Sequence, residues 1–153
     1  MIRARSIRPN IQYGFRDGEE QQVVAHVEGL LLEGISRAVV YVPSVGQVDV
    51  LAGALGKLAG RYSSGMTEEE REASHAAWLA GRAKVMVATT AFGVGVDYPA
   101  VRHVVHCGLP YSMEDYAQES GRAGRDGLGS QSVVFWNARK EKRRLDSTTD
   151  CKV

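Results

Sequence analysis

The stretch Arg37-Ala38-Val39-Val40-Tyr41-Val42-Pro43-Ser44 decides the fold class of this chain. Its apolar residues run continuously instead of alternating with polar ones, which is typical of a strand buried on both faces of a sheet. Pro43 ends the strand, and Ser44 has the side chain of a good helix N-cap. A buried strand that leads directly into a helix is the repeating unit of parallel α/β folds. The stretch therefore predicts a mainly parallel sheet covered by helices.

The same alternation of strands and helices continues on both sides of this stretch. Further strands are expected at 61–64, 84–89, 101–107 and 132–136, with a strand or extended arm at 6–13 that Pro9 keeps at an edge. Helices are expected at 18–32, after Ser44, at 67–80 and after Ser112. The helix after Ser44 should face the core with Val48, Leu51, Leu55 and Leu58. The helix at 67–80 begins with a capping box and should place Trp78 and Leu79 in the core.

These elements predict an α/β protein, a three-layer α/β/α sandwich with helices on both faces of the sheet. We expect residues 1–153 to form a single domain, with an N-terminal arm over 1–17 and a basic, polar tail over 138–153. The length suits one compact domain with its own core.

Composition narrows the possible functions. With 44% hydrophobic and 24% charged residues the chain has the make-up of a globular protein, and no apolar run approaches the ~20 residues of a membrane span. We therefore expect no membrane association. Two cysteines do not make a disulfide framework and fit a reducing compartment. A net charge of +1 means that any site for a polyanion must be a local patch.

Such a patch is offered by Gln118-Glu119-Ser120-Gly121-Arg122-Ala123-Gly124-Arg125-Asp126-Gly127, at the expected end of a short helix. Glycine lets the backbone approach a ligand closely, and arginine carries a permanent charge on a planar fork of donors that suits phosphate. The pair predicts a phosphate clamp that could stabilise charge during phosphoryl transfer. The alternative is a solvated helix end with ordinary surface arginines, and these ten residues alone leave both open.

Two other loops follow buried strands. Ser44 is most simply an N-cap, although the N-terminus of a helix also suits a phosphate. In the second loop, Thr89 and Thr90 supply hydroxyls, Gly93 and Gly95 permit close backbone approach, and Asp97 could accept a hydrogen bond from a ribose hydroxyl. Its Gly-x-Gly lacks the third glycine of a dinucleotide fingerprint. Because ligands gather at the carboxyl ends of parallel strands, we expect these two loops and the arginine stretch at one edge of the sheet.

The sequence contains no Gly-x-x-x-x-Gly-Lys-Ser/Thr and no Asp-Glu pair after an apolar strand that could hold a metal ion. A phosphate clamp without a phosphate cradle indicates half of a nucleotide site, with the other half on another domain. No metal site is predicted, since His103 and His106 lie three apart in a strand and so point to opposite faces. Core or rim roles are expected for both histidines.

Several of these stretches resemble motifs of one family. Residues 87–97 and 99–106 resemble motif V of the RecQ DNA helicases, and residues 118–127 resemble their motif VI. Arg8-Pro9-Asn10-Ile11 resembles the family's entry into its second motor domain, residues 40–44 resemble motif IV, and residues 62–66 match the next motif more loosely. The resemblance extends from about Ile7 to Trp136.

The resemblance implies a RecA-like fold: the C-terminal of two motor lobes of a 3′–5′ DNA helicase that close on ATP and move along a DNA strand. It implies single-stranded and duplex DNA and an N-terminal lobe as partners, with Mg²⁺ held by that other lobe. A nuclear location, or the nucleoid or cytoplasm of a bacterium, is also expected. The chain by itself is expected to be inactive in ATP hydrolysis.

The resemblance also implies roles for individual residues. Arg125 would be the arginine finger, Arg122 a second phosphate contact, and Gln118 a reporter of nucleotide state to the DNA site. The remaining positions are Gly121, Gly95 and Asp97 for the nucleotide, and Ser44, Gly65, Thr89 and Thr90 for the backbone of a single strand. Ser63 stands where the family usually has histidine, and Asp97 where it often has asparagine. A non-catalytic module that binds nucleic acid or a partner, and the equivalent lobe of an RNA helicase, are the alternatives.

Overall fold

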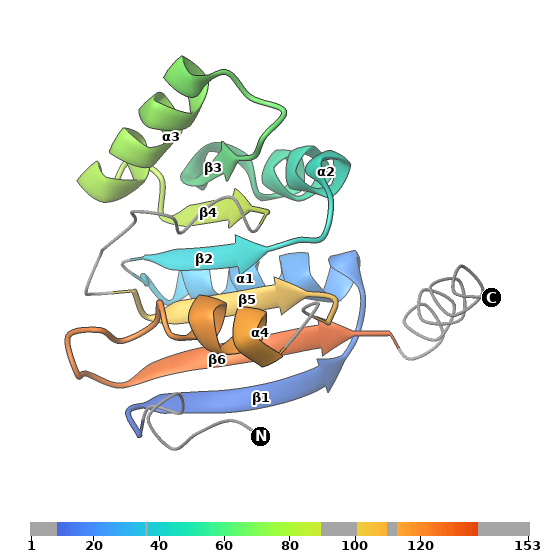
Figure 1. The fold of residues 1–153 in the computed structure, drawn as a ribbon, viewed down its shortest axis with the longest axis vertical. Coiled ribbons are helices and arrows are strands. Elements are labelled where there is room, and N and C mark those ends of the chain that lie inside the picture. Colours follow the sequence, from blue (N-terminus) through green and yellow to red (C-terminus); the bar gives the residue numbers. More distant parts are fainter. Residues whose placement is uncertain (1–8, 36, 90–100, 110–112, 138–153) are drawn as a thin grey trace.

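The computed structural model of the chain describes residues 9–35, 37–89, 101–109 and 113–137. All of the strands described belong to one six-stranded sheet, in which every pairing is parallel and the order is β1-β6-β5-β2-β4-β3 (Figure 1). The strands are β1 (Ile11–Asp17), β2 (Ala38–Tyr41), β3 (Ala59–Tyr62), β4 (Val85–Ala88), β5 (His103–Cys107) and β6 (Ser130–Trp136). The helices are α1 (Glu20–Leu32), α2 (Val45–Leu55), α3 (Glu68–Ala80) and α4 (Met113–Ser120). The predicted α/β class and parallel sheet are confirmed.

Helices cover both faces of the sheet, so the predicted three-layer sandwich is also confirmed. Alternate residues along each strand divide the core into two clusters. The first cluster joins the sheet to α1 and α2 and includes Val23, Val27, Val40, Val48, Leu51, Val87, Val105 and Phe135. The second lies on the opposite face, towards α3 and the chain that follows α4, and includes Val39, Tyr41, Trp78, Met86, Val104 and Ala123. We call the face of the second cluster the α4 face.

The N-terminal region is part of the sheet. We expected an arm over residues 1–17, but Ile11–Asp17 forms β1 and pairs with β6 along its whole length. Gly18 N–H extends the pairing by donating to the Trp136 carbonyl at 2.9 Å. The described part of the arm is therefore a strand, and it lies at an edge of the sheet as Pro9 led us to expect.

Two predicted core positions are wrong. Leu58 does not continue the stripe of α2, because Gly56 takes a positive φ of 83° after Leu55 and the chain passes into a 3₁₀ turn over Gly56–Leu58. Leu79 follows Trp78 by one residue and so faces about 100° away from it on the helix. Both leucines are 41% exposed, whereas Trp78 is fully buried and donates from Nε1 to the Ala38 carbonyl at 3.2 Å.

The helix starts follow the sequence signals where the structure describes them. Thr67 Oγ1 accepts from Glu70 N–H at 3.1 Å and Glu70 Oε1 accepts from Thr67 N–H at 2.9 Å, which is the predicted capping box of α3. Ser112, the expected cap of α4, lies outside the described residues. Within the residues that the structure describes, no helix has the length and apolar character needed to span a membrane.

Candidate nucleotide and nucleic-acid site

The two arginines lie on a turn over Gly121–Gly127, here called the arginine turn, that begins where α4 ends. The turn is bonded to the sheet beneath it, since Gly124 N–H donates to the Val101 carbonyl at 2.8 Å. Ala123, between the two arginines, is fully buried in the core of the α4 face. The backbone that carries Arg122 and Arg125 is therefore packed against the domain.

Side chains from distant parts of the sequence hold the far end of the turn. Asn10 Nδ2 lies 2.8 Å from the Gly124 carbonyl and 2.9 Å from the Leu128 carbonyl, and donates to both. Arg102 Nη2 donates to Asp126 Oδ1 at 2.6 Å, and this hydrogen bond is the first cause that lowers the pKa of the Asp126 carboxyl. These supports were not predicted from the sequence, because nothing in the spacing of the motif links it to Asn10 or Arg102.

Two glycines of the turn, Gly121 and Gly124, are needed for the packing of the protein itself. Gly124 has a φ of 58°, and a Cβ there would lie 2.5 Å from Asn10 Nδ2 and 2.7 Å from Ser130 Oγ. A Cβ at Gly121 would lie 2.8 Å from the Ala117 carbonyl oxygen. The sequence suggested that these glycines allow close approach to a ligand. The close approach that the structure shows is to neighbouring segments of the same chain.

The arginines gather around one buried tyrosine. Burial raises the pKa of the Tyr41 hydroxyl, while the charge of Arg122, a hydrogen bond from its side chain and the charge of Arg125 act in the opposite direction. Arg122 is half-buried and Arg125 is exposed, as is Gln118 on α4. The α4 face thus carries a cationic pair on a fixed backbone, which can receive phosphate oxygens.

The arginine turn does not share an edge with the other two loops. Its contacts to Val101 and Asn10 place it over the α4 face and toward the amino ends of β5 and β6, while Ser44 and Thr89 follow the carboxyl ends of β2 and β4. The predicted common edge is therefore wrong for the turn. The physical reason is that α4 runs back across the sheet after β5, so the chain has left the carboxyl edge before the arginines arrive. The Arg122 side chain nevertheless reaches back to Tyr41, the last residue of β2.

Ser44, Gly65 and Thr89 do come together at the carboxyl edge. Val42 N–H donates to the Ala88 carbonyl at 2.9 Å, and Thr89 N–H donates to the Tyr62 carbonyl at 3.3 Å. A Cβ at Gly65 would lie 2.9 Å from Val45 Cγ1, which places the turn after β3 against the start of α2. Three loops therefore converge at this edge.

The Ser44 side chain caps α2 as predicted. Its Oγ accepts from Gln47 N–H at 3.3 Å and donates to Gln47 Oε1 at 3.0 Å, and the residue is exposed. Nearby, Arg71 Nη1 holds the turn after β3 by donating to the Met66 carbonyl at 2.6 Å. Ser63, which departs from the family pattern, is only 2% exposed and lies beneath this edge. Thr90, Gly95 and Asp97 lie outside the described residues.

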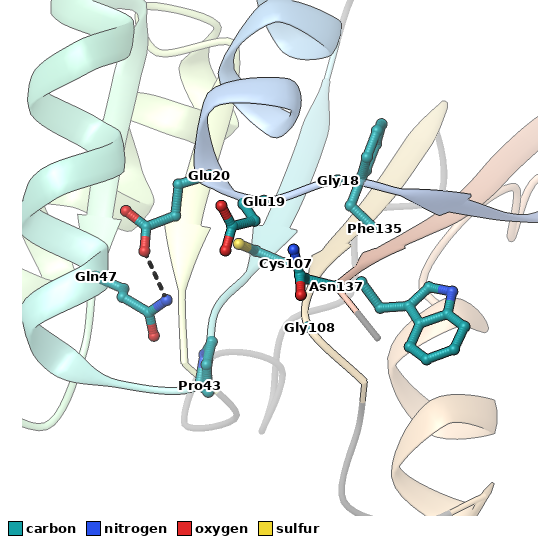
Figure 2. A pocket seen from close by; sticks show the side chains of 10 residues that line it. Gly18, Glu19, Glu20, Pro43, Gln47, Cys107, Gly108, Phe135 and Asn137 are labelled. Atoms are coloured by element: carbon teal, nitrogen blue, oxygen red, sulfur yellow. Dashed lines mark hydrogen bonds between the residues drawn. The ribbon is translucent and has the colours of Figure 1, made fainter. Parts of the chain in front are cut away.

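A cleft at the same edge has the wrong chemistry for a phosphate. It measures about 210 Å³ and lies between the start of α1, the entry to α2 and the ends of β5 and β6 (Figure 2). The carboxylates of Glu19 and Glu20 line it, and Glu20 Oε1 accepts from Gln47 Nε2 at 3.1 Å. Cys107, whose side chain is buried, also lines the cleft. Two carboxylates would repel an anion, so the candidate phosphate site is the arginine turn.

The two strand histidines point to opposite faces, as predicted. His103 lies on the α1 face, where burial is the first cause that lowers its pKa and His26 is the second. His106 lies on the α4 face, with Nε2 3.0 Å from Glu119 Oε1 and its ring 5.3 Å from the ring of Tyr41. The pairing of His106 with Glu119 was not predicted from the sequence, in which the one signal is a polar residue inside an apolar strand. Among the residues described, no group of three or more His, Cys, Asp or Glu is placed to hold a metal ion.

Comparison with known proteins gives the fold a family. Residues 21–127, which include all of α1 but its first residue, the edge loops and the arginine turn, match the helicase conserved C-terminal domain. The chain belongs to this family. Curated relatives agree with the predicted RecQ type: the chain is 37% identical to a putative ATP-dependent DNA helicase Q1 of Caenorhabditis briggsae over 89% of its length, and 38% identical to the ATP-dependent DNA helicase Q-like 2 of Arabidopsis thaliana over 86%. The predicted RecQ membership is confirmed.

The relatives are much longer proteins. The chain spans 23% of the Caenorhabditis protein, 20% of the Arabidopsis protein and 13% of the ATP-dependent DNA helicase RecQ of Bacillus subtilis, with which it shares 46% identity over 79 residues. Among solved structures, E. coli SrmB, a DEAD-box protein bound to the regulator RraA, superimposes with a TM-score of 0.75 and 25% identity, over 87% of this chain and 81% of that one. S. cerevisiae Dbp5, bound to RNA and ADP BeF3, superimposes with a TM-score of 0.75 and 21% identity, over 96% and 41%. These likenesses support the RecA-like helicase fold.

Proposed function

We propose that this chain is the C-terminal motor lobe of a RecQ-like, ATP-dependent 3′–5′ DNA helicase. In this proposal it supplies the arginine finger of a nucleotide site shared with an N-terminal lobe, and part of the track for a single DNA strand. The curated relatives are named as ATP-dependent DNA helicases, which supports the substrate pair of ATP and DNA.

The arginine turn is the observation that carries the proposal. Arg125 is exposed while the residues around it are packed, bonded or buried, so its backbone is fixed and its guanidinium is directed to solvent. A fixed donor needs no reorganisation when negative charge develops on a transferring phosphoryl group. That is the requirement for an arginine finger. The chain has no Gly-x-x-x-x-Gly-Lys-Ser/Thr of its own, so the phosphate cradle must come from the other lobe.

The residues described divide the work between two places. On the α4 face Arg125 contacts the terminal phosphate and Arg122 a neighbouring phosphate oxygen, with Gly121 at the start of the turn. At the carboxyl edge Ser44, Gly65 and Thr89 contact the sugar–phosphate backbone, which carries no sequence information and so permits stepwise movement. ATP hydrolysis supplies the free energy that separates and closes the two lobes. In this proposal Gln118, which is exposed on α4, reports the state of the nucleotide to the DNA site.

The test is DNA-stimulated ATP hydrolysis in a two-lobe protein, in which an N-terminal helicase lobe that carries the phosphate cradle precedes this chain. Arg125→Ala should lower turnover by about 10³–10⁵-fold, as loss of an arginine finger does. Arg125→Lys keeps the charge without the fork and should restore little of the activity. Arg82→Ala removes an exposed arginine near the end of α3 and is the matched control, for which we expect unchanged turnover.

The outcomes separate the competing functions. Turnover by Arg125→Ala that equals the unaltered protein would refute the finger. Hydrolysis by the isolated chain would mean that it carries a cradle of its own and would refute the half-site. Stimulation by oligo(rU) in place of oligo(dT) would favour an RNA helicase lobe. Binding of oligonucleotide without any turnover in the two-lobe protein would favour a non-catalytic module.

A further inference from the structure

A stack of side chains on the α4 face joins the two places of the proposed site. Tyr41 on β2 and His106 on β5 are direct neighbours across the sheet. Their rings are 5.3 Å apart and nearly parallel, at 24°. The ring of Tyr116 on α4 lies 5.9 Å from His106 on another side. The imidazole of His106 is 2% exposed and is therefore held between strand and helix.

The hydrogen bond between His106 and Glu119 bears on which imidazole nitrogen of His106 carries the proton. His106 Nε2 lies 3.0 Å from Glu119 Oε1, and the tautomer with its proton on Nε2 donates a hydrogen bond to this carboxyl oxygen. His106 Nδ1 is buried and has no hydrogen-bond partner within the part of the chain that is described. A proton on Nδ1 would leave a buried donor unsatisfied, which costs about 1–3 kcal/mol. Both nitrogens therefore favour the same tautomer.

Each end of the stack reaches a different functional residue. Tyr41 precedes the Val42–Ser44 loop by one residue, and Ser44 lies at the carboxyl edge. At the other end, Glu119 is followed by Ser120, Gly121 and Arg122 along the chain. Ser120 ties that segment to the helix, since its Oγ donates to the Tyr116 carbonyl at 2.6 Å. Arg122 and Glu119 both interact electrostatically with the Tyr41 hydroxyl, so the segment that follows Glu119 returns to the Tyr41 end of the stack.

We propose that His106 is a positioning residue that acts through Tyr41 and Glu119. It holds the Arg122 side chain in a fixed position relative to the Ser44 end of β2. A nucleic acid bound at the carboxyl edge therefore changes the position of the Arg122 side chain. This inference rests on the proposed function, because it assumes a strand at Ser44 and a phosphate at Arg122. Buried, fully packed side chains transmit a displacement because they cannot yield independently. Arg122 meets the Tyr41 side chain directly, and His106 keeps the Tyr41 ring in place by stacking on it, while Glu119 anchors His106.

The test uses the 153-residue chain itself, labelled with ¹⁵N-arginine. The Nε–Hε signal of Arg122, assigned by its loss in Arg122→Lys, is followed while oligo(dT) is added, and the affinity is measured separately by fluorescence anisotropy. In the unaltered chain we expect the Arg122 signal to shift with the same midpoint as binding. His106→Phe keeps a ring but loses the donor, and Glu119→Ala removes the acceptor. Both should bind oligo(dT) with unchanged affinity while the Arg122 shift is lost.

Glu119→Gln supplies the rescue, because its side-chain oxygen still accepts from His106 Nε2, and the Arg122 shift should be kept. If Glu119→Ala does not fold, as the loss of a buried partner can cause, the comparison of Glu119→Gln with His106→Phe still decides. An Arg122 shift that survives in His106→Phe, or an Arg122 signal that stays still while the unaltered chain binds DNA, would overturn the inference alone. Absence of any oligo(dT) binding would instead overturn the proposed DNA track.

Discussion

Gly124→Ala tests whether the arginine turn is held as the structure describes. An alanine at a φ of 58° costs about 1–2 kcal/mol in the left-handed region. Its Cβ would also lie 2.5 Å from Asn10 Nδ2, 2.7 Å from Ser130 Oγ and 2.9 Å from the Leu128 carbonyl. Overpacking of this kind typically costs about 1–3 kcal/mol. We expect a total near 3 kcal/mol, which for a domain of this size lowers the thermal midpoint by about 6–12 °C.

Two neighbouring glycines provide matched controls. Gly127 has a φ of 85° but a Cβ there would meet nothing within 4 Å, so Gly127→Ala should show only the backbone cost of about 1–2 kcal/mol. Gly129 has neither constraint, and Gly129→Ala should stay within about 0.5 kcal/mol of the unaltered chain. Urea and thermal unfolding followed by circular dichroism give the three values. Equal midpoints for Gly124→Ala and Gly127→Ala would show that the contacts to Asn10 and Ser130 do not hold the turn.

Three further predictions concern the rest of the fold. Thr67→Ala should lower the free energy of unfolding by about 1 kcal/mol, because α3 loses its cap, and Thr67→Ser should restore most of it; equal urea midpoints for both variants would contradict this. Trp78→Ala should cost about 3–5 kcal/mol by emptying a fully buried site, measured in the same way, and a loss below 1 kcal/mol would be incompatible with that burial. Burial lowers the pKa of both His26 and His103 and is the largest cause of the shift in each. Below about pH 6.5 the unfolded chain therefore binds more protons than the folded one, and stability falls as the pH drops. Urea midpoints between about pH 7.5 and 5.5 should change less in the variant with His26→Gln and His103→Gln, and an equal slope would argue against the two histidines.

The sequence predicted the elements well because each carries a local signal. The apolar run at residues 38–42, the capping box at Thr67 and the helical spacing around Val23 each determine a strand or helix by themselves. The errors arose where the structure of a residue depends on another segment of the chain. Leu58 has the right spacing for the stripe of α2, but the turn at Gly56 ends the helix first. Strand order has no local signal either, since a parallel crossover can place the next strand on either side.

The candidate site was predictable in its residues and not in its arrangement. Ser44, Gly65 and Thr89 follow three adjacent strands, so the rule for carboxyl edges places them together. The arginine turn obeys no such rule, because its position depends on how far α4 runs back across the sheet. His106 and Glu119 belong to different elements, and their hydrogen bond appears only when helix and strand are packed. Single-residue signals therefore locate the parts of a site, while the links between the parts require the three-dimensional fold.

The pairing of β1 with β6 has a consequence for how the chain is made. A ribosome releases β1 first, yet the strand that completes it is Ser130–Trp136, and Asn10 meets its partner Gly124 only 114 residues later. During synthesis Ile11 and its neighbours must wait without a partner strand, and contacts so distant in sequence form slowly. The arginine turn is among the last features to be secured, because Asn10 contributes to it. A nascent chain would hold the two arginines of the turn in place only after nearly all of the domain has emerged.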